Sequence, residues 1–204
     1  MTTLFAARGT ISSAVALTLE EAGMPYDLRV INNAAGEQRT AKYLAINPKG
    51  RVPALRTDRG VLSEAGAILD YIAAQNPDAD LVPNDPFQAA KMREMMYYLA
   101  STMHPNHAHG LRQERWTDEV SAYAGMAAKV PETMTASCAY VEDFMVGPFV
   151  LGDQMSLADP YLFTVCTWCE GDGVDMSVFP TLTAFRDAFA KRASVKSISE
   201  KGLL

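Results

Sequence analysis

The stretch Asn47-Pro48-Lys49-Gly50-Arg51-Val52-Pro53-Ala54-Leu55 decides how the first half of the chain is interpreted. Its first four residues are a turn signal, and Val52–Leu55 is predicted to be a strand that opens with proline. Because proline cannot donate a ladder hydrogen bond, such a strand is expected at a sheet edge. If the Val52–Pro53 bond is cis, the backbone of Val52 is free to pair with an extended peptide-like ligand. If it is trans, the proline merely starts the strand.

A strand, a helix and a second strand are predicted before this stretch. Thr3–Ala6 and Tyr26–Ile31 are the expected strands. Between them, Ser12–Ala22 is a predicted helix, because its apolar residues Val15 and Leu19 recur at helical spacing. This order forms a βαβ unit, so the two strands are expected to be parallel.

A hairpin and a further helix are predicted after the stretch. Asp58-Arg59-Gly60 is typical of a hairpin turn that leads into a strand at Val61–Ser63. Ala67–Gln75 follows as a helix, and a short helix is expected just before Ile46. The N-terminal part is therefore predicted to be an α/β domain.

A linker divides the chain. Asn76–Pro86 holds three prolines, three aspartates and two asparagines. We therefore expect one domain at 1–78, a linker at 79–86 and an all-helical domain at 87–204. The predicted helices of this second domain are separated by prolines: Phe87–His104, Val120–Lys129, Glu132–Val146, Leu157–Glu170 and Leu182–Lys191.

Composition excludes several classes of protein. The 204 residues are 49% apolar and 21% charged, which suits a globular protein with a real core. A formal net charge of −6 argues against a nucleic-acid partner and against binding to an anionic membrane. No stretch has the length and apolar character of a membrane span or signal peptide. Three cysteines cannot all pair, so a reducing, cytoplasmic location is expected.

Two short stretches have features of ligand sites. In Gly9-Thr10-Ile11-Ser12-Ser13, backbone N–H groups and a helix dipole would favour a thiolate or carboxylate, although Ser and Thr also cap ordinary helices. In Ser63-Glu64-Ala65-Gly66, the Glu64 carboxylate is suited to a ligand ammonium and the following amides to a ligand carboxylate. An ordinary helix start has the same pattern.

Taken together, these stretches resemble the glutathione transferase family, most closely its bacterial beta class. The likeness covers nearly the whole chain in the right order, and its specific part is the stretch from Asn47 to Leu55. The other matching segments are Ala14–Leu17, Glu21–Tyr26, Leu62–Ile68, Ser156–Asp159 and Tyr161–Val165.

The resemblance implies a thioredoxin-like N-terminal domain, an all-helical C-terminal domain, a homodimer and a role in detoxification. It implies glutathione as co-substrate, held by the segment Arg51-Val52-Pro53. Val52 would pair with the cysteinyl backbone of glutathione, and Glu64 with the amide of Ala65 would hold its γ-glutamyl end. The second-substrate pocket would lie in the helical domain.

Activation of the glutathione thiol is the chemical problem. A free thiol has a pKa of about 8.5, so only a few per cent is thiolate at neutral pH. The beta class carries a cysteine in the turn before the first helix, one residue before a serine, and Ile11 stands there in this chain. Isoleucine can neither donate a hydrogen bond to a thiolate nor form a mixed disulfide. Ser12 is therefore the first candidate to stabilise the thiolate, with Thr10 as the alternative.

His104 matches the active-site histidine of the beta class. It would polarise or protonate a group near the thiol, which suits an imidazole. The alternative is a histidine that ends a helix before Pro105. His107 and His109 lie near enough in sequence to line the second-substrate pocket. The three histidines are not expected to bind a metal, because Pro105 interrupts the helix that would bring them together, and no metal is predicted.

Two further motifs are interpreted as structural. Cys166-Thr167-Trp168-Cys169 has the spacing of a redox pair, but it falls inside a predicted helix, so these cysteines and Cys138 are expected to pack in the core. Ser156 and Asp159 form a predicted capping box. The Ser156 hydroxyl is expected to accept from the Asp159 amide, and the Asp159 carboxylate from the Ser156 amide.

The predicted function is a glutathione transferase that conjugates glutathione to small apolar electrophiles by thiolate attack. The loss of the turn cysteine leaves two alternatives. One is a protein that binds glutathione or apolar ligands without turnover, and the other is a glutathione-dependent peroxide or disulfide reductase.

Overall fold

A computed structural model describes residues 2–204 and divides them into two compact units. The first runs up to Val82 and also includes Ala190–Leu204, and the second is Pro83–Phe189. The last fifteen residues therefore belong with the N-terminal unit rather than with the helices that precede them in sequence.

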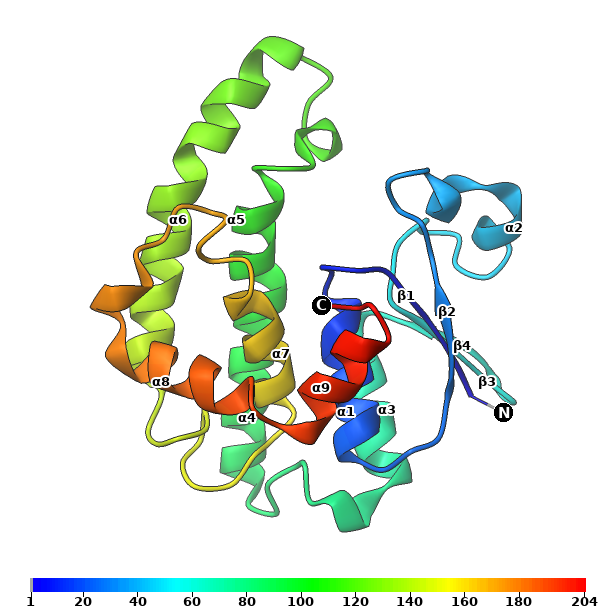
Figure 1. The fold of residues 1–204 in the computed structure, drawn as a ribbon, viewed down its shortest axis with the longest axis vertical. Helices are drawn as coiled ribbons and strands as arrows, with labels where there is room; N and C mark the ends of the chain where they lie inside the picture. Colours follow the sequence, from blue (N-terminus) through cyan, green and yellow to red (C-terminus); the bar gives the residue numbers. More distant parts are fainter. Residues whose placement is uncertain (1) are drawn as a thin grey trace. The chain divides into compact units, whose positions relative to one another are not determined.

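The N-terminal unit contains a four-stranded mixed sheet in the order β2-β1-β3-β4 (Figure 1). Its strands are β1 (Thr3–Ala6), β2 (Asp27–Val30), β3 (Ala54–Thr57) and β4 (Gly60–Ser63). β1 and β2 are parallel, whereas β3 pairs antiparallel with both β1 and β4. The predicted βαβ unit and the predicted hairpin are both confirmed.

The predicted edge position of the proline-led strand is wrong. β3 lies between β1 and β4, and its ladder begins with Ala54 opposite Phe5 and Ser63. Pro53 stands one residue before the first paired residue, so its missing N–H removes no ladder hydrogen bond. That position is as compatible with an inner strand as with an edge strand.

Helices cover both faces of the sheet. α1 (Ser12–Glu21) and α3 (Ala65–Gln75) lie on one face (Figure 1). On the other face, Phe5 packs against Tyr43 of α2 (Ala41–Leu44), with the ring centroids 6.1 Å apart. This sandwich and the helical second unit confirm the predicted thioredoxin-like fold followed by an all-helical part.

Helix α1 is more deeply buried than its sequence suggests. An apolar stripe predicts one buried face, yet all eight residues from Ser12 to Leu19 are buried. Part of this burial comes from α9 (Ala193–Glu200), a helix absent from the predicted set, which packs along α1. Its eight residues form only about two turns, fewer than the roughly 11–18 residues over which apolar periodicity is assessed.

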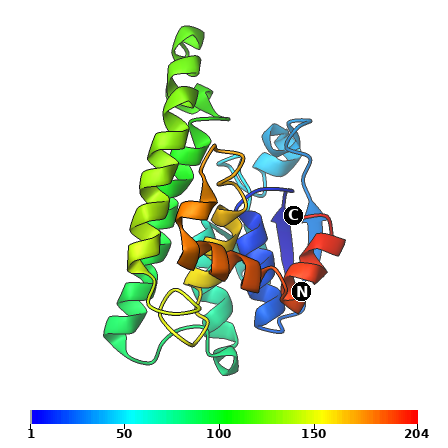
Figure 2. The same ribbon diagram turned by 60° about the vertical axis from the view of Figure 1, so that its left-hand side comes forward.

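The second unit contains only helices and their connections. Figure 2 shows α6 running beside α5. The helices are α4 (Pro86–Tyr98), a π-helical turn (Leu99–Met103), α5 (His104–Ala108), α6 (Tyr123–Phe144), α7 (Ala158–Cys166) and α8 (Pro180–Phe189). Short 3-10 turns lie at Glu37–Arg39 and Pro77–Ala79 in the first unit, and at Gln113–Arg115, Val120–Ala122 and Met176–Val178 in the second.

Two prolines do not end helices as predicted. The helix that begins at Pro86 continues through Pro105 to Ala108. At the π-helical turn the N–H of His104 bonds to the carbonyl of Leu99, five residues back, and this offset accommodates the missing donor of Pro105. Pro131 lies inside the continuous helix α6, where one buried face offsets the lost hydrogen bond.

The capping box at the start of α7 is only half as predicted. The Asp159 carboxylate accepts from the Ser156 amide at 2.7 Å, as expected, and also from the Val150 amide at 2.8 Å. The Ser156 hydroxyl, however, donates to the same carboxylate at 3.0 Å instead of accepting from an amide. Asp159 is fully buried, and these donors supply the hydrogen bonds that a buried carboxyl group requires.

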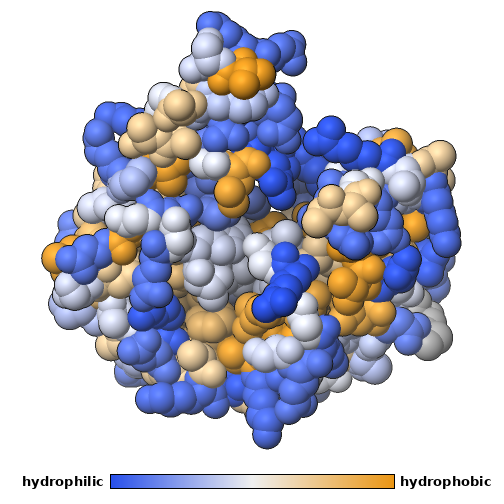
Figure 3. Space-filling view, turned by 45° about the horizontal axis from the view of Figure 1, so that its top comes forward, coloured by the Kyte–Doolittle hydropathy of each residue, from blue (hydrophilic) through white to orange (hydrophobic). Residues whose placement is uncertain are grey.

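The lengths and hydropathy of the helices bear on whether any could span a membrane. Within residues 2–204, every helix is too short or too polar to cross a membrane. On the face shown in Figure 3, hydrophobic residues form separate groups between hydrophilic ones.

Candidate functional site

The turn between β1 and α1 is held by a compact hydroxyl network. The Ser12 Oγ accepts from the Ala7 amide at 3.0 Å and lies 3.1 Å from the Ala7 carbonyl and 2.6 Å from Thr10 Oγ1. Thr10 Oγ1 lies 2.8 Å from the same carbonyl. Ser12 is fully buried, whereas Thr10 is partly exposed.

The same turn presents two free backbone donors at the N-terminus of α1. The Ser12 amide bonds to Thr10 Oγ1 and the Ser13 amide to the Thr10 carbonyl, but the N–H groups of Thr10 and Ile11 have no partner within residues 2–204. The Ile11 side chain is buried. Free N–H groups together with the positive end of the helix dipole form an environment that favours an anion.

The Val52–Pro53 bond is cis, which settles the alternative left open by the sequence. The backbone N–H and carbonyl of Val52 have no hydrogen-bond partner in the described chain, and Pro53 is buried. Val52 therefore has one free donor and one free acceptor next to the sheet, the arrangement that pairs with an extended peptide.

Two side chains fix the preceding residue. Tyr43 Oη donates to the Arg51 carbonyl at 2.8 Å, and Asn47 Nδ2 donates to it at 2.7 Å. Burial raises the pKa of Tyr43 to about 12, so its hydroxyl stays protonated as a donor. The Arg51 side chain is exposed. Tyr43 and Asn47 were not among the predicted site residues, although Asn47 lies in the stretch that decides the fold.

Glu64 adopts an unusual backbone conformation at the start of α3. Its φ of 75° and ψ of 118° lie in a region that non-glycine residues rarely occupy. Its exposed carboxylate pairs with Lys49, and the N–H of Ala65 has no partner among residues 2–204. A backbone outlier of this kind, beside a free helix-start amide, is typical of a functional position. The role of Lys49 has no local sequence signal, because its partner is fifteen residues away.

His104 lies in the second unit, at the start of α5. It is partly exposed, and its ring centroid is 5.1 Å from that of Trp168. The ring of His107 stacks on the same Trp168 indole, with the centroids 4.3 Å apart. The His107 Nδ1 atom lies 2.8 Å and 2.9 Å from the two carboxylate oxygens of Asp172. His104 is thus not a helix-ending residue. The contact of His107 with Asp172 spans 65 residues, which the sequence could not show.

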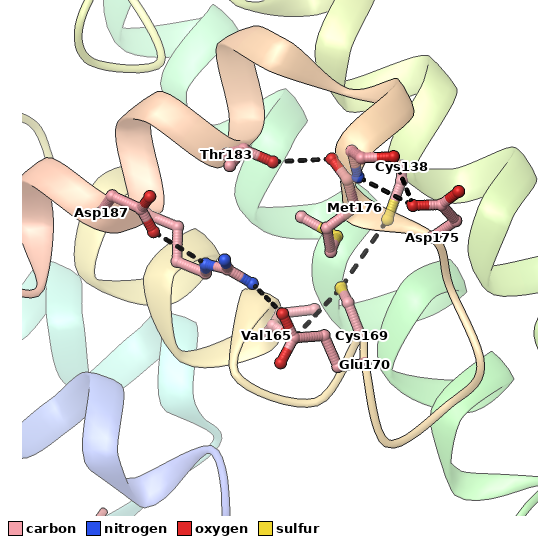
Figure 4. Close-up of polar contacts among 10 residues, drawn as sticks. Cys138, Val165, Cys169, Glu170, Asp175, Met176, Thr183 and Asp187 are labelled. Atoms are coloured by element: carbon pink, nitrogen blue, oxygen red, sulfur yellow. Dashed lines mark hydrogen bonds and ion pairs between the residues drawn. The ribbon is translucent and has the colours of Figure 1, made fainter.

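The three cysteines gather in the core of the second unit. The Sγ atoms of Cys138 and Cys169 are 3.7 Å apart, between α6 and the turns after α7 (Figure 4). All three thiols, including Cys166, are buried. α7 ends at Cys166, four residues before the predicted end at Glu170, so Cys169 lies beyond the observed helix. In the described part of the chain, no three His, Cys, Asp or Glu side chains are placed to hold a metal ion.

Comparison with known families covers most of the chain. Residues 10–75 match the model of the glutathione S-transferase N-terminal domain, and residues 111–201 match that of the glutathione S-transferase C-terminal domain. The first match contains Thr10, Val52 and Glu64.

Individual relatives agree with these matches. A maleylacetoacetate isomerase from Pseudomonas aeruginosa is 30% identical, over 90% of this chain and 88% of its own. The crystal structure of a glutathione transferase homologue from Sulfitobacter with bound glutathione is 53% identical, covers 100% of this chain and 99% of its own, and has a TM-score of 0.98. A beta-class glutathione S-transferase from Sphingomonas chungbukensis is 28% identical, covers 99% and 100%, and has a TM-score of 0.84. The chain therefore belongs to the glutathione S-transferase family.

Proposed function

We propose that this protein conjugates glutathione to small apolar electrophiles. The glutathione sulfur attacks as a thiolate, a carbon–sulfur bond forms, and the leaving group departs with its electron pair. The observation that carries this proposal is the turn before α1, which combines the partly exposed Thr10 hydroxyl with the free amides of Thr10 and Ile11.

The available donors are sufficient for thiol activation. Lowering the thiol pKa by two units requires about 2.7 kcal/mol of preferential stabilisation of the anion. A hydrogen bond to a charged group contributes about 1.5–3 kcal/mol, and a helix N-terminus adds about 0.3–1 kcal/mol. One hydroxyl and the start of α1 therefore reach the required magnitude without a cysteine.

Thr10 and Ser12 take different roles in this proposal. The Ala7 carbonyl lies within hydrogen-bond distance of both hydroxyls. When the buried Ser12 hydroxyl instead donates to Thr10 Oγ1, 2.6 Å away, the Thr10 hydroxyl can turn its own proton to the thiolate. Thr10 is then the contact residue, and Ser12 is its support. The position of the hydroxyl on the exposed side of the network favours Thr10 over the residue that the sequence ranks first.

The rest of glutathione is assigned to the same unit. Val52 offers both backbone groups to the cysteinyl residue, on the segment fixed at Arg51 and Pro53. The γ-glutamyl end carries an ammonium and a carboxylate, which match the Glu64 side chain and the free Ala65 amide. Glutathione bound to the Sulfitobacter structure supports this co-substrate.

His104 is proposed to assist at the electrophile. Its imidazole is partly exposed and rests against Trp168, and it can donate or accept a proton near neutral pH. The apolar electrophile itself is proposed from the resemblance to the family and from the role in detoxification that this resemblance implies.

The first test is the ultraviolet absorbance of the glutathione thiolate bound to the protein, titrated with pH. We expect a bound-thiol pKa about two units below the free value of about 8.5, and a rise toward the free value in Thr10→Val. Binding with an unshifted pKa would contradict thiolate activation and favour the non-catalytic binding protein. A hydroperoxide or mixed disulfide turned over faster than an aryl halide would favour the reductase.

A second candidate is a glutathione-dependent isomerase, which the name of the Pseudomonas aeruginosa relative favours. The two reactions differ in the fate of glutathione. Conjugation consumes one thiol per product, whereas an isomerisation returns it unchanged. Counting free thiols during turnover therefore separates them.

We further propose that the protein is a cytoplasmic homodimer. Phe87 and Tyr97 on α4 are 68% and 61% exposed, and together with Glu94 they line a groove of about 520 Å³. Two such aromatic side chains on one helix suit burial against a second copy. Sedimentation of Phe87→Asp is the test, and an unchanged dimer would exclude this face of α4 as the dimer interface.

The three free thiols are consistent with a reducing compartment, which supports the proposed cytoplasmic location.

A further inference from the structure

The end of the chain returns to the turn proposed to activate glutathione. The carbonyl of Leu203 accepts a hydrogen bond from the Gly9 amide at 3.1 Å and one from the Ser13 hydroxyl at 3.0 Å. These donors stand on either side of the segment from Thr10 to Ser12. One carbonyl therefore fixes both ends of the turn that carries the proposed anion site.

The acceptor is held firmly in place. Leu203 is fully buried, and its own amide bonds to the Ile198 carbonyl, so it is tied to the end of α9. Gly202 has a φ of +76°, the left-handed conformation that glycine adopts without strain. This conformation turns the chain from α9 back toward the start of α1.

Helix α9 is in turn anchored along α1. Arg192 donates to both carboxylate oxygens of Glu21, at 2.6 Å and 2.8 Å, and the Ser194 hydroxyl also donates to Glu21. Near the other end of α9, Lys201 pairs with Glu20. The position of the Leu203 carbonyl is thus supported by contacts from both ends of α9 to the last two residues of α1, as well as by its own burial.

Glycine at position 9 completes the arrangement. Its φ of +64° places its N–H toward Leu203, immediately before the free amide of Thr10. Stabilisation of a thiolate depends on donors that are already oriented before the anion forms. A turn whose two ends are fixed keeps the amides of Thr10 and Ile11 and the Thr10 hydroxyl in one orientation.

We propose that Ser13 and the Gly202–Leu203 segment are positioning elements for the thiolate site. The inference rests on the proposed function, because it concerns the same turn. Neither element contacts the sulfur. They act through Gly9 and Thr10, and their effect is on the pKa of the bound thiol rather than on the binding of the glutathione backbone at Val52.

The test compares Ser13→Ala, and a chain that ends at Gly202, with the unaltered protein. Two controls keep the Leu203 carbonyl: Ser199→Ala, whose hydroxyl bonds within α9, and Leu204→Ala. The readouts are hydrogen exchange of the Gly9 amide, the absorbance titration of bound glutathione, and turnover of an aryl halide across pH.

We expect Gly9 exchange to rise at least tenfold in both altered chains and the bound-thiol pKa to rise by about half a unit or more. The loss of kcat should be largest at low pH and shrink as the thiol ionises fully, with KM for glutathione nearly unchanged. The controls should match the unaltered protein. Ser13→Ala removes only one hydroxyl, so this variant still tests the inference if the shortened chain does not fold.

Two results would overturn the inference. Unchanged Gly9 exchange in Ser13→Ala and in the shortened chain would mean that the carbonyl does not hold the turn. Faster Gly9 exchange with an unshifted thiol pKa, or a loss of rate equal at every pH, would mean that the contact is only structural.

If the unaltered protein shows no lowered thiol pKa, the proposed function fails and this inference with it. A lowered value that survives in both variants overturns this inference alone.

Discussion

The turn before α1 and the cysteine cluster of the second unit are opposites in chemical terms. The turn has polarising groups that a ligand can reach, namely the partly exposed Thr10 hydroxyl and two free amides, but its own side chains include no thiol. The cluster has three thiols, all of them buried. A thiol becomes a nucleophile only where it is both polarised and accessible. In this protein the two conditions are met together only if glutathione supplies the sulfur.

The electrostatics of the cluster agree with an internal role. The Cys169 thiol donates to the Val165 carbonyl at 3.7 Å and lies 3.7 Å from the Cys138 sulfur. Contact with Cys169 and burial raise the pKa of Cys138 and of Cys166. The thiols of Cys138 and Cys166 therefore stay protonated. Burial also leaves a substrate no direct access to these thiols.

The largest expected effect comes from bringing a thiol to the turn. In Ile11→Cys the new side chain stands at the N-terminus of α1, where a thiolate is stabilised. We expect this variant to take up one glutathione from glutathione disulfide as a mixed disulfide, with release of one glutathione thiolate. Mass spectrometry of the intact chain measures the product.

The matched control for this change is Ile11→Ala, which leaves a similar gap without a thiol. Neither this control nor the unaltered protein should be modified. Modification of the unaltered protein at the same rate would show that the buried cysteines are accessible, and the contrast between the two regions would disappear.

The cluster itself should resist labelling. We expect the three thiols to react with a maleimide at least about a thousandfold more slowly than a free thiol, because they become accessible only when the structure opens. In denaturant all three should react at the rate of free cysteine. Rapid labelling of one thiol in the native protein, followed by peptide mapping, would identify an accessible cysteine and contradict the structural role.

The sequence predicts the general form of both regions and leaves out their decisive geometry. Local patterns identify β1, α1 and the hairpin, since turn signals and apolar periodicity act over a few residues. The Asn47–Leu55 stretch also identifies Val52 as a residue whose backbone can pair with a ligand. The order of strands, however, is a property of the assembled sheet, and the edge position predicted from Pro53 is wrong.

The candidate site shows the same limit. Sequence places Thr10 and Ser12 in one turn but cannot show that Ser12 is buried and Thr10 is partly exposed. The positive φ of Glu64 has no signature in its side chain. Contacts of Leu203 with Gly9 and Ser13 span about 190 residues, and helix α9, which brings them together, is too short to be predicted from apolar periodicity.

A moderate effect is expected from removing the support of the turn. Ser12→Ala leaves the Ala7 amide without its acceptor in a fully buried position. We expect a loss of about 1–3 kcal/mol in the free energy of unfolding, the cost of one unsatisfied buried donor. Urea unfolding measures this loss. Thr10→Val is the comparison, because its partly exposed hydroxyl should affect the thiol pKa more than stability, and the reverse pattern would exchange the two proposed roles.

The smallest effect concerns the anchor of α9 and depends on pH. Burial alone would raise the pKa of Glu21, but hydrogen bonds from Arg192 and Ser194 outweigh it and hold the pKa below its usual value. A carboxylate with a lowered pKa in the folded state stabilises the fold above its unfolded pKa, and this contribution is lost as the pH falls through the folded value. Glu21→Gln should therefore lower the free energy of unfolding by about 1–2 kcal/mol at neutral pH, and the difference from the unaltered protein should vanish in acid. Urea unfolding across pH measures it, with the exposed Asp118→Asn as control. A difference that persists unchanged in acid would mean that Glu21 acts through packing, and that the charge on α1 does not hold the helix that positions Leu203 against the turn.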